Sequence, residues 1–288
     1  MEELVGLNAA ERLFLMIPIY RVVLGVFVLL ILSAIGGIWL RRRFSGKDGT
    51  GGTGFEGEGY VVTAASGLLA LLLGFTFAMA VDRFDERRML VIDEANGIYS
   101  TYLLAQTFPQ PDSGRISSTL LAYLDHRLAV SRKSPIDQKP GALQLDRHLK
   151  AQLWRESLEA TRNLRDDVAS TYLQTAAQTL EVGATREAIR LARIPPFIHV
   201  VLWVFSAITV TAFGFSYYGR ARWLGLCVII FLQTLALALI LDLDRPTSGI
   251  IRESQWALED VKHRLRDTPP SEFLPNNQTS APEAPGGL

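Results

Sequence analysis

Apolar residues are concentrated in four blocks of the chain, and each block lacks Asp, Glu, Lys and Arg. The blocks are Val22 to Leu40, Tyr60 to Val81, Phe197 to Tyr218 and Trp223 to Leu241. At about 1.5 Å of rise per residue, a helix of this length crosses a hydrocarbon core of about 30 Å. The pattern therefore predicts four transmembrane helices over residues 22–40, 60–81, 197–218 and 223–241.

The segment between the second and third blocks, residues 82–196, contains no run that is long and apolar enough to span a membrane. Apolar residues recur in it at four-residue spacing, as at Ile116, Leu120 and Leu124, which is typical of amphipathic helices. No strand-like alternation is present, and good helix formers are abundant. The sequence thus predicts an all-α integral membrane protein with a helical, water-facing domain between the second and third transmembrane helices.

The remaining segments connect or flank these elements. Residues 1–21 form an N-terminal segment, and residues 41–59 form a glycine-rich loop that is expected to be flexible. Residues 242–267 form a juxtamembrane segment, and residues 268–288, rich in Pro, Asn and Ser, are expected to be a disordered tail.

Charge placement predicts the orientation of the chain. Four spans put both termini and the 82–196 domain on the same side of the membrane. Arginine and lysine near the span ends are more numerous on that side, although Arg41, Arg42 and Arg43 lie on the other. Because positive loops stay inside, the central domain and both termini are expected in the cytoplasm, with the chain in the inner (plasma) membrane.

Composition argues against several functional classes. Lys plus Arg and Asp plus Glu number 29 each, so no basic field indicates a nucleic-acid partner. Cys227 is the only cysteine, the four histidines have no metal-ligand spacing, and no phosphate-binding loop or nucleophile elbow occurs. We therefore expect no enzyme activity, no cofactor and no metal site, and the lipid bilayer is the first expected partner.

The first polar cluster lies where the second span ends and comprises Asp82, Arg83, Glu86, Arg87 and Arg88. Opposite charges in it fall three and four residues apart, on common faces of a helix. The cluster is either a self-paired helix exit or, when repeated around an oligomer axis, a charged ring at a pore mouth.

A second polar string follows the fourth span, and its notable residues are Asp242, Asp244, Arg245, Pro246, Ser248 and Gly249. Paired aspartates can supply hard oxygen ligands to a divalent cation. In the alternative interpretation, the charged side chains form an interfacial ion-pair network, and the proline and glycine turn the chain along the membrane surface.

The spans contain almost no ionisable residue, which disfavours ion-coupled transport. An apolar pore needs none, because a hydrophobic constriction can gate by dewetting. Leu71, Phe75 and Met79 of the second span offer such a constriction. Ordinary helix packing, aided by the small residues of this span, is the alternative interpretation.

Several strings resemble a known family. Leu73-Gly74-Phe75, the Asp82 to Arg88 cluster and Asn96 resemble the second-helix region of bestrophins. Glu94-Ala95-Asn96, Arg193-Ile194-Pro195-Pro196 and the Leu241 to Gly249 string resemble a bacterial family of bestrophin-like membrane proteins. The likeness extends over about residues 18–266.

The resemblance implies a pentameric anion channel with four spans, a cytoplasmic helical domain and a neck lined by the second span. Phe75 matches the neck phenylalanine and Leu71 the neck position one turn earlier, whereas Gly67 stands where a third bulky residue is usual. The implied protein is a homo-oligomer that passes small anions. A non-conducting, membrane-anchored interaction or regulatory protein is the alternative.

Overall fold

The computed structural model describes residues 17–44, 58–131, 141–164, 166–191, 194–216, 222–245, 249 and 251–273. The chain divides into two compact units, which are described separately. Unit 1 comprises Met1–Arg87 and Arg190–Glu253, and unit 2 comprises Arg88–Ile189 and Ser254–Leu288. Most of the predicted glycine-rich loop, at 45–57, and of the predicted disordered tail, at 274–288, lies outside the described residues.

Unit 1 contains the four apolar helices. They are α2 (Ile19–Phe44), the first part of α3 (Glu58–Ala105), α7 (Pro196–Ser216) and α8 (Arg222–Asp244). All four are long and apolar enough to cross a membrane. No strand occurs among the described residues, so the predicted all-α fold with four transmembrane helices is confirmed.

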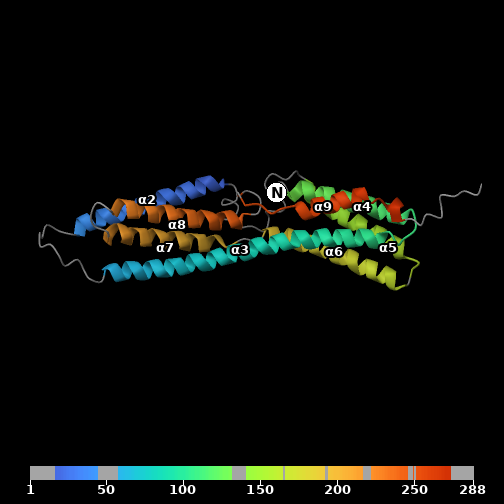
Figure 1. Ribbon diagram of the computed structural model, residues 1–288, viewed down its shortest axis with the longest axis horizontal. Coiled ribbons are helices and arrows are strands. Elements are labelled where there is room, and N and C mark those ends of the chain that lie inside the picture. Colours follow the sequence, from blue (N-terminus) through green and yellow to red (C-terminus); the bar gives the residue numbers. More distant parts are fainter. Residues whose placement is uncertain are drawn as a thin grey trace, which may run out of the picture. The chain divides into compact units, whose positions relative to one another are not determined.

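Helices α2, α7 and α8 run alongside one another (Figure 1) and share one apolar core. In α2 the buried hydrophobic side chains are Val26, Leu30, Ala34 and Ile38, at a regular four-residue spacing that follows one face of the helix. Many of the other apolar side chains of these helices are exposed in the chain. Such an outward apolar surface is what a bilayer requires, because lipid is the solvent there.

Two glycines let α2 and α7 approach closely. A Cβ atom added to Gly37 would collide with the carbonyl oxygen of Thr211, and one added to Gly214 would lie 2.6 Å from the carbonyl oxygen of Ala34. In a bilayer the hydrophobic effect does not drive helices together, because lipid is as apolar as their side chains. Small residues stabilise helix association there because they let the backbones approach and increase van der Waals packing.

Arg41 caps the C-terminal end of α7. Its Nη1 donates to the carbonyl oxygen of Phe215 at 2.6 Å and to that of Ser216 at 3.2 Å. The last carbonyls of a helix have no partner within the helix, and a guanidinium there also meets the negative end of the helix dipole. One arginine of the Arg41 to Arg43 run therefore joins the first span to the third.

Unit 2 is a bundle of amphipathic helices around the second part of α3. They are α4 (Asp112–Ser131), α5 (Ala142–Thr161), α6 (Asp167–Leu191) and α9 (Trp256–Asp267), followed by the short 3-10 helix η3 (Pro270–Phe273). Ile98, Tyr102, Leu120, Leu153 and Tyr172 lie at the centre of its core. Helix α3 ends shortly before Pro109 and Pro111, as the loss of backbone donors requires.

The start of the predicted disordered tail is packed in unit 2. The hydroxyl of Tyr102 donates to the carbonyl oxygen of Thr268 at 2.5 Å, and the ring of Phe273 lies edge-on to that of Tyr102 at 6.4 Å. Residues 268–273 are thus held by a core tyrosine. Composition alone could not reveal this contact, because Tyr102 lies 166 residues earlier in the chain.

Candidate functional site

Helix α3 is the least enclosed of the four apolar helices. Only 17% of its most apolar window is buried inside the chain, against 28%, 33% and 28% for α2, α7 and α8. The side chains of Leu71, Phe75 and Met79 are 53%, 65% and 39% exposed. The chain itself therefore covers a narrow stripe of this helix and leaves the predicted neck residues uncovered.

The uncovered side of α3 carries a seam of mostly small residues, which comprises Ala64, Gly67, Leu71, Gly74 and Ala78. All five are exposed. They are spaced alternately three and four residues apart, the repeat that keeps one helix face against a neighbouring helix. Four of the five are glycine or alanine, which permit close backbone approach in a membrane. The seam therefore has the composition and the repeat of a helix-packing surface.

The polar cluster at the end of this apolar stretch is not a single exposed ring. Asp82, Glu86 and Arg88 are exposed and Arg83 is half-buried, but Arg87 is only 2% exposed. The Arg87 Nε lies 3.0 Å from a carboxylate oxygen of Glu253, and its Nη2 donates to the carbonyl oxygen of Leu243 at 2.7 Å. Arg87 thus anchors α3 within unit 1.

Because Arg87 is buried, it does not contribute to the exposed charge of residues 82–88. The other charged side chains of the segment are the three acids Asp82, Asp85 and Glu86 and the two bases Arg83 and Arg88. The segment has a slight negative excess, so it does not by itself concentrate anions.

The polar string begins in the last turn of α8, and its charged side chains Asp242, Asp244 and Arg245 are buried and hydrogen-bonded. An Asp242 carboxylate oxygen accepts the backbone N–H of Ile251 at 2.8 Å, and one of Asp244 accepts that of Ile194 at 2.9 Å. The Arg245 Nη1 donates to the carbonyl oxygen of Ile17 at 2.8 Å. These charged residues therefore tie the ends of three helices together within unit 1.

Gly249 packs closely against this set of hydrogen bonds, since a Cβ atom there would lie 2.6 Å from an Asp242 carboxylate oxygen. Pro246 and Ser248 lie outside the described residues. Within the part of the chain that the structure describes, no group of three or more His, Cys, Asp or Glu side chains could hold a metal ion. The contacts favour the structural interpretation of this string over the cation site.

Sequence analysis missed a buried ionic network in unit 2. Glu94 is fully buried, and its carboxylate accepts from the Arg186 Nη1 at 2.5 Å, the Tyr123 hydroxyl at 2.7 Å and the Arg127 Nη2 at 3.3 Å. Arg127 also lies 3.6 Å from Asp146. The available signal was the position of Glu94 on the apolar stripe of α3, one turn before Ile98.

The network fixes the ionisation of its members. Burial, followed by the negative charge of Glu94, raises the pKa of Tyr123 well above its usual value, so the hydroxyl remains a donor. Burial alone would lower the pKa of Arg127, but Glu94, Tyr123 and Asp146 together outweigh it, and the pKa of this guanidinium is raised. Both pKa shifts are away from neutral pH, so they keep Tyr123 protonated and Arg127 charged and do not prepare either group for proton transfer.

Comparison with solved structures identifies the fold. A crystal structure of a bacterial bestrophin homologue from Klebsiella pneumoniae superposes with a TM-score of 0.63 at 15% sequence identity, covering 85% of this chain and 97% of that one. A single-substitution variant of a bacterial bestrophin homologue from the same organism gives 0.65 at 14% identity, covering 86% and 97%. At this identity the likeness establishes a shared fold.

Comparison of sequences identifies the family. No curated protein matches the chain at a significant level. The sequence profile described as the bestrophin-like domain matches residues 5–255, which include all four apolar helices and the whole of the segment between the second and third. This integral membrane protein therefore belongs to the bestrophin-like family.

Proposed function

We propose that the protein is a homo-oligomeric channel of the inner membrane in which α3 helices from several copies surround an axial pathway for small anions. The observation that carries the proposal is the exposed seam of α3. The seam has the repeat of a helix-packing surface and is left uncovered by the chain's own helices. A second copy is its natural partner, because identical seams can pack around a symmetry axis.

Leu71, Phe75 and Met79 would form the constriction of this pathway. Each is apolar, large and exposed in the single chain, and an apolar constriction controls flow by dewetting. The pentameric state and the cytoplasmic position of unit 2 and both termini are parts of the same proposal. They are supported by the family and by the excess of positive charge on that side.

The choice of anions rests on the family, since the exposed charges at the end of the apolar stretch of α3 are slightly negative in sum. Ion class therefore has to be measured rather than read from these residues. The experiment is flux into vesicles that contain the purified protein, with chloride and potassium followed separately. The mass of the detergent-solubilised particle is measured in parallel.

Phe75→Ala tests the constriction, and Phe77→Ala is its matched control. Phe77 is also exposed on α3, but two residues along a helix turn the side chain to nearly the opposite face. We expect chloride flux to rise in Phe75→Ala and to stay unchanged in Phe77→Ala. Equal effects of the two substitutions, or potassium flux without chloride flux, would contradict the proposal as stated. A single-copy particle without flux would support the non-conducting interaction protein instead.

A further inference from the structure

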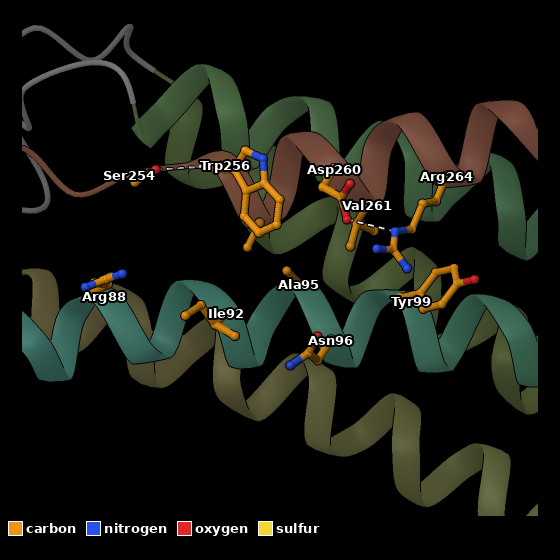
Figure 2. Close-up of a pocket in the computed structure, with 11 residues that line it drawn as sticks. Arg88, Ile92, Ala95, Asn96, Tyr99, Ser254, Trp256, Asp260, Val261 and Arg264 are labelled. Carbon is orange, nitrogen blue, oxygen red and sulfur yellow. Dashed lines mark hydrogen bonds and ion pairs between the residues drawn. The ribbon is translucent and has the colours of Figure 1, made fainter.

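Unit 2 contains a pocket of about 310 Å³ between α3 and α9 (Figure 2). One wall comes from a single face of α3 that runs from Arg88 to Tyr99, and the other from Ser254 and the part of α9 between Trp256 and Arg264. The volume is at the lower end of the range for small-molecule sites. Neither the buried ionic network of unit 2 nor the seam of α3 uses these side chains.

The floor and one side of the pocket are apolar. Ile92 and Ala95 on α3 face Ala257 and Val261 on α9, and Ala95 and Val261 are buried. Trp256 is 68% exposed, and Figure 2 shows its ring reaching from α9 toward α3. An indole ring left so exposed beside an apolar floor offers a flat surface that another apolar group can cover.

The charges of the pocket are unequal. Arg264 already has partners within the pocket. Its Nε lies 2.7 Å from an Asp260 carboxylate oxygen, and its guanidinium lies 5.6 Å from the centre of the Tyr99 ring. Arg88, at the other end, has no hydrogen-bond or ion-pair partner among the described residues. With Asp260 neutralised by Arg264, one uncompensated positive charge remains beside the apolar floor.

We propose that this pocket binds a small organic carboxylate with a flat, apolar body. The Arg88 guanidinium binds the carboxylate through two parallel, charge-assisted hydrogen bonds. Such bonds are stronger than those between neutral groups. The Trp256 ring covers the apolar body against Ile92 and Val261. This chemistry separates the site from a general anion site, because inorganic anions would gain nothing from the indole ring.

The test uses isothermal titration of the purified full-length protein in detergent with a matched pair of probes. Indole-3-acetate carries the carboxylate, and indole-3-acetamide has nearly the same shape without the charge. We expect saturable binding of the acetate and binding of the acetamide that is at least about tenfold weaker. Arg88→Gln should reduce the affinity for the acetate to that for the acetamide and leave the acetamide unaffected.

Two further variants separate a specific site from general effects. Trp256→Ala should weaken both probes by a similar factor, and Trp256→Phe should restore most of the affinity while keeping an aromatic ring. Arg147→Gln is the control, since Arg147 is exposed on α5 and does not line the pocket. The proposal is overturned if the acetate does not bind, if Arg88→Gln binds it undiminished, or if Arg147→Gln weakens it equally. Because the readout is binding alone, its result does not depend on whether the protein conducts ions.

Discussion

Glu94→Gln is the substitution that most directly tests the ionic network of unit 2. The Glu94 carboxylate is fully buried and accepts from Arg127, Arg186 and Tyr123. A glutamine keeps the size of the side chain but removes its negative charge. It also places an amide donor opposite guanidinium donors. The two arginines, both largely buried, then lose their shared counter-charge.

The expected cost follows from this loss. Removing one partner of a buried ion pair typically costs about 3–5 kcal/mol, because the remaining charge is left uncompensated away from water. Asp146 lies 3.6 Å from Arg127 and offsets part of that charge, so we expect about 3 kcal/mol. For a domain of this size that corresponds to a fall of roughly 10 °C in Tm.

The assay is thermal unfolding in detergent, with hydrogen exchange of α4 and α6 as a local readout. Glu86→Gln is the matched control, because Glu86 lies on the same helix but is exposed. Its Tm should stay within about 1–2 °C of the wild type, since exposed substitutions seldom exceed about 0.5 kcal/mol. Increased exchange should appear in α4 and α6 of the Glu94 variant alone.

A double substitution checks the reasoning. Glu94→Gln with Arg127→Met removes an acid and a base together, so its cost should be smaller than the sum of the single costs by about 1–3 kcal/mol. Additive costs would refute the idea that the two side chains stabilise the unit as a pair. A Glu94→Gln variant as stable as Glu86→Gln would refute it as well.

The other predictions concern single contacts. Arg87→Gln should lower the Tm by several degrees because it removes a buried ion pair and a hydrogen bond to the Leu243 carbonyl, while Arg88→Gln, at an exposed position, should leave the Tm unchanged. Gly37→Ala should reduce the yield of folded protein because its Cβ meets the α7 backbone, whereas Gly36→Ala, which meets nothing within 4 Å, should be tolerated. Burial lowers the pKa of His126 below its ordinary value of 6.5. The unfolded chain therefore binds a proton at a pH where the folded chain does not, so stability should be present above pH 6.5 and be lost as the pH falls toward the lowered pKa. Melts between pH 7.5 and 5.5 should show this slope, and His126→Gln should flatten it.

The four spans could be predicted from the sequence because the bilayer sets their length and excludes charge from them. Residues 60–81 are recognisable with no knowledge of tertiary contacts, and they lie within α3 as a single uninterrupted helix. The helical character of the middle segment was equally accessible, since the four-residue spacing of Ile116, Leu120 and Leu124 marks one face of α4 and all three are buried.

The roles of individual charged residues could not be predicted in this way. Arg87 and Arg88 are neighbours of identical type, yet about 100° of helix rotation places one in the core and the other in water. Only Leu243, 156 residues later, and Glu253 decide which one is buried. Glu94 shows the same difficulty, because Arg186 lies 92 residues away and no local pattern announces the pair. That Leu71, Phe75 and Met79 line a pore remains a prediction.

The contact between Arg41 and the end of α7 also constrains the order of assembly during synthesis. The two partners are 174 residues apart, and a ribosome that adds about 5–20 residues per second needs roughly 10–35 s to make the intervening chain. During that interval α2 exists without α7, so the face of α2 that carries Gly37 has no α7 backbone to pack against. Helices α4, α5 and α6 of unit 2 are complete before α7 is made, whereas α9, which contributes Leu258, Val261 and Leu265 to the core of unit 2, is made only after α8. The third span therefore joins the first span late in synthesis, with α8 still to be made, and slow insertion at that step would leave the first span without its partner.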